Sequence, residues 1–224
     1  MTIVASFDIG KKNFAFCIEK FDTTILEKLV PIRKVNRYNK MGCIEPNFST
    51  LLTSVFLTGE ILLHKNLDLT SDTTPGKYLD TQIFYNMITE LDKYKELFDQ
   101  CDTIIIEQQM SFKKAQNTMA IKLGQHCFSY FTMRYPITEI NNIVFDGRKE
   151  IIEFPAYHKT QLLGAPKGLN KPDRKKWAVE KTREIFALRG CEDYFSGVKK
   201  KDDLADTFLQ LQSFKLLRFV DGLM

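Results

Sequence analysis

The sequence has no long hydrophobic run and few cysteines, and both absences narrow the class of protein. In its 224 residues, no apolar stretch approaches the roughly 18 residues that suggest a membrane-spanning helix. The five cysteines are odd in number and none stands in C-x-x-C spacing, so the sequence predicts neither a disulfide framework nor a zinc site. We therefore expect reduced thiols in an intracellular protein that does not bind membranes.

The N-terminal segment lacks the features of a targeting signal. The first apolar run, residues 3–7, stops at Asp8, and no basic segment precedes it, which argues against a secretory signal. The first 20 residues contain no arginine and two acids, Asp8 and Glu19, which argues against a transit peptide. With 44% hydrophobic and 27% charged residues, the composition is typical of one globular domain of 1–224 and excludes a disordered chain, a collagen or a coiled coil.

The net charge of +4 is modest, but the positive residues are clustered. Such clusters suit a polyanion such as a nucleic acid, and a set of solvated helix and loop faces is the alternative explanation. The three clusters are Lys171, Arg174, Lys175, Lys176, Lys181 and Arg183; Lys199, Lys200 and Lys201; and Arg33, Lys34, Arg37 and Lys40.

The hydrophobic pattern predicts strands near the N-terminus. Residues 3–9 and 13–19 are apolar runs around a short link, which is typical of an antiparallel hairpin. A third strand over 23–32 is less clearly indicated, residues 33–52 are not assigned, and 55–63 fit either a strand or a helix. The segment 64–77 reads as a polar loop. Two further strands are predicted, at 103–106 and 142–145.

Helices dominate the rest of the pattern. Apolar residues at helical spacing predict four helices, over 78–98, 113–134, 172–188 and 203–219. Pro172 at the start of the third and Gly190 just past its end fit the usual helix boundaries. The segment 146–170 is expected to be partly irregular. The order of elements indicates an α/β or α+β layered fold with a mixed sheet.

Acidic residues stand where three of these elements end or begin. Asp8 closes the first strand, Glu107 follows the central strand, and the last helix opens with Asp202, Asp203 and Asp206. Helical spacing lets Asp206 share a face with either Asp203 or Asp202. Each feature alone also fits an ordinary solvated strand end or helix face. Together, several carboxylates at one sheet edge repel each other unless divalent cations lie between them, and oxygen ligands suit Mg²⁺ or Mn²⁺.

Three motifs in order carry a family resemblance. Residues 6–13 (SFDIGKKN), 104–109 (IIIEQQ) and 200–206 (KKDDLAD) resemble the RuvC-type Holliday junction resolvases, and most closely those of poxviruses and other large DNA viruses. An acid directly after a strand, as at Glu107, favours this branch over simple RNase H enzymes, whose second acid lies on a helix. The sequence departs from the small bacterial members by extra residues near 33–52 and 64–78.

The resemblance implies a fold, an activity and a set of ligands. The fold is α/β and RNase H-like, a five-stranded mixed sheet flanked by helices. The activity is Mg²⁺-dependent cleavage of four-way DNA junctions by a homodimer, with two ions per active site, no small-molecule cofactor and, for a viral protein, action in the cytoplasmic virus factory. The implied catalytic residues and metal ligands are Asp8, Glu107, Asp203 and Asp206, and Asp202 is the neighbour that a shift by one would select.

Nine side chains are candidates for contact with DNA. Lys159 and Lys201 are candidate phosphate contacts, and Phe112 is a candidate for stacking on a base, with core packing as its alternative. Met110, rather than Phe112, stands in the register of the aromatic residue of bacterial relatives. The full set is Lys11, Lys12, Gln108, Phe112, Lys159, Arg174, Lys175, Lys176 and Lys201.

Two other functions fit parts of the pattern. Actin-like and sugar-kinase ATPases also begin with a strand that ends in Asp-Ile-Gly, but they need a second phosphate loop and are usually much longer. A non-catalytic nucleic-acid-binding scaffold of the same fold is the second alternative. ATP binding would identify the first, and the absence of metal-dependent cutting would identify the second.

Overall fold

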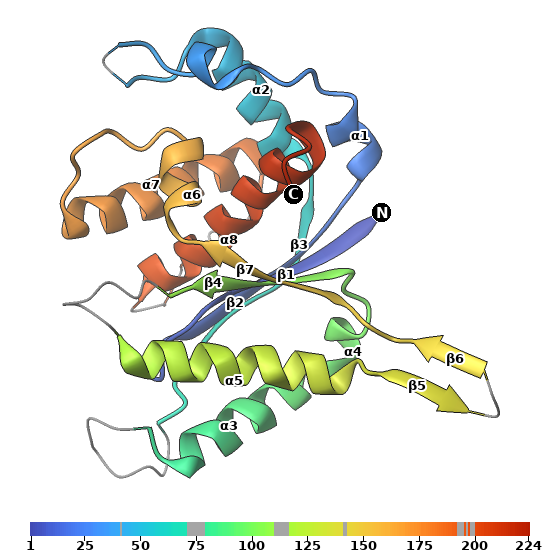
Figure 1. The fold of residues 1–224 in the computed structure, drawn as a ribbon. Coiled ribbons are helices and arrows are strands. Elements are labelled where there is room, and N and C mark those ends of the chain that lie inside the picture. The colour runs from blue at the N-terminus through green and yellow to red at the C-terminus, as the bar shows by residue number, and fades with distance from the viewer. Residues whose placement is uncertain are drawn as a thin grey trace.

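The computed structural model describes residues 1–40, 42–70, 79–109, 117–140, 143–191, 195, 197 and 200–224. Its centre is a five-stranded sheet in the order β3-β2-β1-β4-β7, with helices on both faces (Figure 1). A separate two-stranded sheet, β5-β6, projects from the body. The strands are β1 (Thr2–Asp8), β2 (Phe14–Phe21), β3 (Glu60–Leu67), β4 (Thr103–Gln108), β5 (Ile137–Ile140), β6 (Ile143–Asp146) and β7 (Glu150–Pro155).

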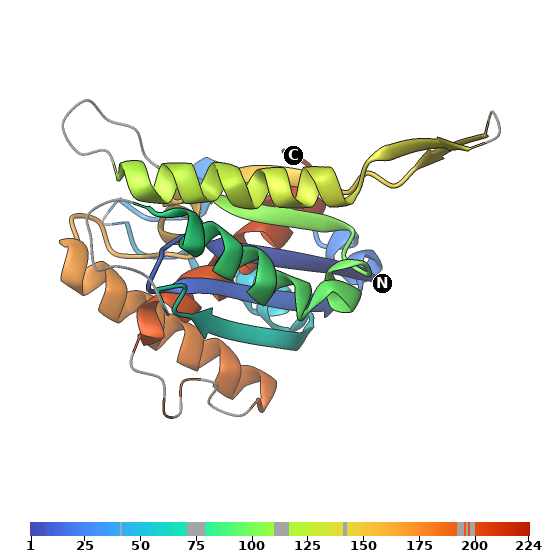
Figure 2. The same cartoon turned by 90° about the horizontal axis from the view of Figure 1, so that it is seen from below.

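The helices form one layer on each side of the main sheet. Figures 1 and 2 show α3, α4 and α5 on one face and α2, α6, α7 and α8 on the other. The helices are α1 (Thr23–Glu27), the 3-10 turn η1 (Lys34–Asn36), α2 (Pro46–Leu57), α3 (Thr81–Asp92), α4 (Lys95–Phe98), α5 (Thr118–Arg134), α6 (Tyr157–Leu162), α7 (Lys171–Arg189), α8 (Lys201–Lys215) and the π-helical turn η2 (Leu216–Val220).

The strand directions make the sheet mixed. Strands β1, β2 and β3 pair antiparallel, whereas β4 runs parallel to β1 and β7 runs parallel to β4. The predicted α/β class with a five-stranded mixed sheet is therefore confirmed, as is the hairpin of the first two strands. No helix in the described ranges is long and apolar enough to cross a membrane.

The two faces of the sheet bury separate cores, because side chains alternate along a strand. On β1, Val4 faces the core under α7 and α8, while Ala5 and Phe7 face the core under α3 and α5. On β4, Ile105 belongs to the first core and Ile106 to the second. This alternation decides which face the acidic residue after each strand occupies.

Buried charges attach the last two long helices to the sheet. Glu19 on β2 is fully buried and pairs with Arg189 of α7 at 2.7 Å and with Lys215 of α8 at 3.3 Å. Gln212 of α8 donates a further hydrogen bond to Glu19 at 3.1 Å. A buried carboxylate is tolerated only with such compensation, so the cluster fixes how α7 and α8 pack on the sheet.

Residues 23–32 were predicted as a third strand, and that prediction is wrong. Asp22 accepts a hydrogen bond from the backbone N–H of Thr24 and caps the short helix α1 instead. The third strand is β3, whose last four residues fall in the segment 64–77 that was predicted as a loop. The range 55–63 fitted either a strand or a helix. The structure divides it, because α2 ends with residues 55–57 and β3 begins with residues 60–63.

The region 146–170 is more regular than predicted. It contains β7, which pairs with β4 as the edge strand of the sheet, and α6. The strand predicted at 142–145 corresponds to β6, which pairs with β5 outside the main sheet. The helix predicted over 78–98 is two helices, α3 and α4, with Lys93 capping the first. The helices predicted at 113–134, 172–188 and 203–219 correspond to α5, α7 and α8 with η2.

Candidate metal-dependent nuclease centre

Asp8 and Glu107 are brought together by the parallel pairing of β1 and β4. Phe7 lies opposite Ile106, so the next residues of both strands, the two acids, are neighbours. Because side chains alternate along a strand, Asp8 lies on the same face as Val4, and Glu107 lies on the same face as Ile105. Both acidic side chains therefore point to the face covered by α8. Sheet register and alternation therefore gather two carboxylates at one point.

A tight turn follows Asp8 and returns the chain into β2. A Cβ on Gly10 would lie 2.9 Å from the carbonyl oxygen of Asn13, so the turn needs a residue without a side chain. Lys11 and Lys12 occupy this turn, half-buried and exposed respectively. The strand end, and the acid on it, are thereby held at the rim of the sheet.

Asp206 and Lys159 complete the cluster from the helical layer. Lys159 lies on α6, is 8% exposed, and places its Nζ atom 3.0 Å from Oε1 of Glu107 and 2.9 Å from Oδ2 of Asp206 on α8. Gln109 donates a longer hydrogen bond to Glu107, at 3.4 Å. One ammonium thus lies among carboxylates from two strands and a helix.

Burial and neighbouring charges shift the pKa values of Asp8 and Glu107 in opposite directions. Burial, with the nearby charge of Glu107, raises the pKa of Asp8 well above its ordinary value. Burial also opposes ionisation of Glu107, but the Lys159 ammonium and hydrogen bonds from Asp8 and Lys159 outweigh it and lower the pKa of Glu107. The pKa values of the two neighbouring carboxyl groups are therefore shifted in opposite directions.

The same balance acts on Lys159 and Asp206. Burial works against the charged ammonium, yet the carboxylates of Asp206, Glu107 and Asp8 raise the pKa of Lys159 above its ordinary value. Burial raises the pKa of Asp206, although Lys159 partly offsets this effect. Lys159 therefore compensates only part of the negative charge that the carboxylates of the centre carry when ionised.

The neighbouring acids on α8 have different surroundings. Asp202 forms an ion pair with Lys175 of α7, and this contact, opposing burial, lowers the pKa of Asp202. Asp203 has a buried Oδ2 atom without a hydrogen-bond partner among the described residues. Burial, with the charge of Asp202, raises the pKa of Asp203 to about 6. Asp202 has a direct ion-pair partner, whereas Asp203 forms no ion pair within the described residues.

The donor set fits a hard divalent cation. Asp8, Glu107, Asp203 and Asp206 offer only oxygen atoms, which Mg²⁺ and Mn²⁺ prefer. The unpartnered buried oxygen of Asp203 and the excess of carboxylates over ammonium both point to a missing positive charge. In the described part of the chain, no three acidic, histidine or cysteine side chains already stand as a metal-binding group.

The basic side chains of α7 have three different kinds of surroundings. Arg174 is exposed and lines a cavity beside Lys159 and Asp206. Lys175 pairs with Asp202, and Lys176 points outward near Glu180 at 3.8 Å. Only part of the cluster is therefore directed at the carboxylates.

The other candidate DNA contacts are dispersed around the centre. Lys201 begins α8 and lines a shallow hollow with Lys176 and Arg183. Gln108 is exposed at the end of β4. Phe112, like Met110, lies outside the described residues. In the third basic cluster, Arg37 is buried in an ion pair with Asp221 at 2.6 Å, which is a structural role.

Sequence reasoning missed some contributors to the centre. It treated Lys159 as a phosphate contact and did not anticipate that its ammonium lies among the acids. Gln109 was expected to line the DNA-facing mouth, and its hydrogen bond to Glu107 was not anticipated. Tyr38 and Lys167, which line a cavity next to the centre, carried no signal in the sequence because they come together only in the fold.

Comparison with known proteins places the chain among viral relatives. No family model matches the sequence. Protein 170L of Invertebrate iridescent virus 6, described as uncharacterized, is 31% identical over 96% of this chain and 89% of its own length. Protein 97L of Invertebrate iridescent virus 3 is 29% identical over 95% of this chain and 99% of its own length.

Solved structures with a similar fold are Holliday junction resolvases. The fowlpox virus resolvase, solved with its substrate Holliday junction DNA, has a TM-score of 0.52 at 18% identity and covers 96% of this chain and 99% of its own. Thermus thermophilus RuvC has a TM-score of 0.51 at 10% identity, over 97% of this chain and 98% of its own. The protein has the RNase H-like fold of the RuvC-type resolvases, as the resemblance predicted. By sequence it belongs to the viral protein family that includes 170L.

Proposed function

We propose that this protein is a Mg²⁺-dependent endonuclease that cuts four-way DNA junctions. The observation that carries the proposal is the convergence of Asp8, Glu107 and Asp206 on Lys159, at the end of parallel strands in a resolvase-type fold. The three acids come from chain segments almost 200 residues apart, and grouping them costs electrostatic free energy. A function that uses a divalent cation explains the arrangement.

Each residue of the centre has a distinct task in this proposal. When bound, two ions of Mg²⁺ or Mn²⁺ held by Asp8, Glu107, Asp203 and Asp206 would supply charge for attack on a phosphodiester and for departure of its leaving oxygen. Lys159 lies between Glu107 and Asp206 and offsets the repulsion between their carboxylates. Basic side chains around the centre, including Arg174, hold the DNA backbone without reading its sequence.

The proposed substrate indicates an oligomeric state, and the viral relatives indicate where the protein acts. A four-way junction has two symmetric strands to cut, so a homodimer with two centres matches its two-fold symmetry. The relatives belong to large DNA viruses, and we place the activity in recombination, repair or processing of a viral genome in the cytoplasmic virus factory.

The proposal is tested by comparing substrates and metals. Labelled four-way junction, linear duplex and RNA–DNA hybrid are incubated with the purified protein in Mg²⁺, in Ca²⁺ and in EDTA. We expect symmetric cuts in the junction with Mg²⁺, and binding without efficient cutting in Ca²⁺, because Ca²⁺ takes more ligands at longer distances.

Each alternative has its own result in the same assay. Binding of the junction in every condition without cutting would favour the non-catalytic scaffold and overturn the proposal. Preferential cutting of the hybrid would leave a metal-dependent nuclease with a different substrate. Saturable binding of ATP without DNA cleavage would favour the ATPase alternative.

A further inference from the structure

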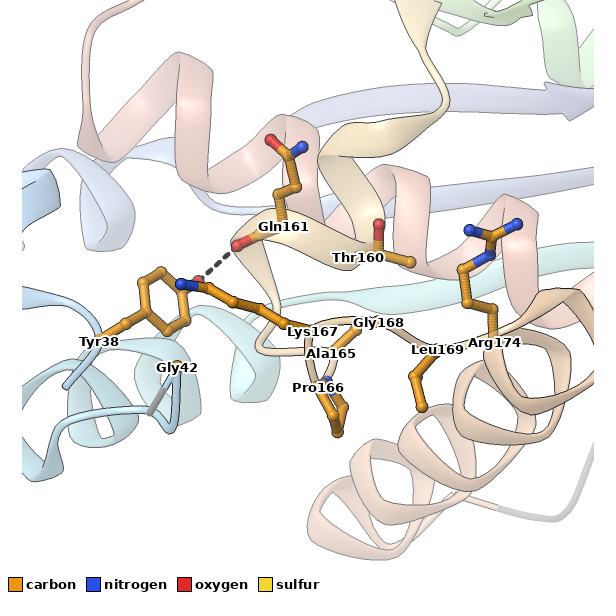
Figure 3. A pocket seen from close by; sticks show the side chains of 10 residues that line it. All are labelled: Tyr38, Gly42, Thr160, Gln161, Ala165, Pro166, Lys167, Gly168, Leu169 and Arg174. Carbon is orange, nitrogen blue, oxygen red and sulfur yellow. Dashed lines mark hydrogen bonds between the residues drawn. The ribbon is translucent and has the colours of Figure 1, made fainter. Parts of the chain in front are cut away.

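A second cavity adjoins the carboxylate centre and has a basic lining. Its volume is about 430 Å³, and its ten lining residues come from the segment after η1, the end of α6, the α6–α7 loop and the start of α7 (Figure 3). Two of these residues, Lys167 and Arg174, are cationic, and the described lining contains no carboxylate. The full lining is Tyr38, Gly42, Thr160, Gln161, Ala165, Pro166, Lys167, Gly168, Leu169 and Arg174.

The cavity lies beside the centre and shares lining residues with a hollow that borders it. A hollow of about 270 Å³ contains Lys159 and Asp206 on its wall. Thr160 and Arg174 line both that hollow and the second cavity, and Figure 3 shows them on α6 and α7, with Lys167 on the loop between these helices. A chain of phosphates that leaves the carboxylates past Arg174 therefore arrives at Lys167.

Tyr38 and Gly42 form one wall of the cavity; they lie within 33–52, where the family resemblance predicts extra residues relative to small bacterial resolvases. The hydroxyl of Tyr38 donates hydrogen bonds to the carbonyl oxygens of Gln161 at 2.6 Å and Leu162 at 2.9 Å. A Cβ on Gly164 would lie 2.1 Å from Cδ1 of Ile44. The extra segment is thus fitted closely against the end of α6, the helix that carries Lys159.

The two cations of the cavity are available to a ligand. Lys167 and Arg174 are both exposed, and neither forms an ion pair within the described residues. A Cβ on Gly42 would lie 3.2 Å from Cε of Lys167, so the extra segment supports the stem of this lysine. A lysine whose aliphatic stem packs on the protein while its unpaired ammonium faces solvent is well placed to contact a phosphate.

We infer that the cavity is a phosphate-binding track for the DNA strand that flanks the cut, with Lys167 and Arg174 as its contacts and with Tyr38 and Gly42 in its outer wall. This inference rests on the proposed function and extends it, because it names where a strand leaves the centre. The extra segment then serves to hold a junction arm rather than only to enlarge the fold.

The test uses neutral phosphates in the DNA. Four-way junctions carry one methylphosphonate at successive positions on either side of the cut, and affinity is measured in EDTA to prevent cleavage. Lys167→Ala is compared with wild type and with Lys28→Ala, which removes an exposed lysine at the end of α1. We expect one flanking methylphosphonate to weaken wild-type binding by about 3- to 10-fold, and Lys167→Ala to abolish that sensitivity, as in a double-mutant cycle.

The salt dependence of DNA affinity tests the same contacts independently. The double variant Lys167→Ala/Arg174→Ala should lose up to about 0.9 per phosphate contact in the log–log slope of affinity against salt on duplex DNA. If wild type cuts the junction while this variant keeps the affinity and slope of Lys28→Ala, the track is refuted and the proposed function stands. If wild type neither binds nor cuts junctions, the proposed function itself fails.

Discussion

Lys159 determines how three carboxylates coexist in the apo protein. Its ammonium contacts Glu107 and Asp206 directly, while Asp8 keeps a raised pKa through burial and the charge of Glu107. Asp203, one turn before Asp206, has no such partner among the described residues. The carboxylates of the centre therefore outnumber its ammonium groups among the described residues, which fits the divalent cation of the proposed function.

Asp203 and Asp202 give the sharpest test of individual roles. We expect Asp203→Asn to eliminate junction cleavage and not to lower Tm, because a buried oxygen of Asp203 has no hydrogen-bond partner among the described residues and the pKa of Asp203 is raised to about 6. Asp202→Asn should leave substantial activity, since Asp202 is already neutralised by Lys175. Single-turnover cleavage and thermal melting measure both effects. An inactive Asp202→Asn with an active Asp203→Asn would move the ligand role to Asp202.

At the scale of elements, the close fit between the 38–44 segment and α6 depends on a glycine. Gly164 has a φ of +83°, and an added Cβ would meet Ile44. We expect Gly164→Ala to lower Tm more than Gly168→Ala, which has a φ of +78° but open space around it. Both variants incur about 1–2 kcal/mol of left-handed backbone strain, so their difference isolates the clash. Ile44→Ala should partly rescue Gly164→Ala, and equal melting of the two glycine variants would contradict this account.

His64 links β3 to α8 and makes stability sensitive to acid. Its Nε2 atom lies 2.9 Å from the carbonyl oxygen of Leu204, and burial lowers the pKa of His64 to about 4. The unfolded chain, with a histidine pKa near 6.5, binds more protons than the folded protein between these values, so stability falls as pH drops from about 6.5 to 4. We expect His64→Gln to remove about 3 kcal/mol of that loss in urea titrations. An unchanged pH slope would show that His64 is not responsible.

Elements with a strong local pattern could be predicted from the sequence. The strands β1, β2 and β4 are continuous apolar runs, and α7 has both a capping Asn170 and a terminal Gly190 in the left-handed conformation. In contrast, β7 was missed because it is an edge strand in a segment rich in proline and glycine, where pairing with β4 decides its structure. The strand predicted over 23–32 failed because a local cap at Asp22 favoured a helix.

The candidate site was predictable in part for a related reason. Asp8, Glu107 and Asp206 stand next to recognisable elements, so their motifs indicated one group of acids. The place of Lys159 was not predictable, because it depends on how α6 packs against α8 after a stretch of chain without a clear pattern. The cavity of Lys167 and Arg174 likewise exists only when loops distant in sequence meet.

At the scale of the whole molecule, ion pairs serve two separate purposes. The buried cluster of Glu19, Arg189 and Lys215 pairs one carboxylate with two cations and attaches helices to the sheet. The cluster of Asp8, Glu107, Asp206 and Lys159 lies at the strand ends, borders a cavity, and retains an excess of negative charge. The first arrangement stabilises the fold, and the second is suited to binding a cation and a polyanion together.

The central claim is that this second cluster cuts DNA junctions, and Asp8→Asn tests it most directly. Binding and single-turnover cleavage of a labelled four-way junction are measured in parallel with Mg²⁺ for wild type and the variant. We expect near wild-type affinity, because the basic surface that contacts phosphates is unchanged, and a cleavage rate lower by about 100-fold or more, because a charged ligand is lost. Cleavage by Asp8→Asn at a rate near that of wild type would contradict the account.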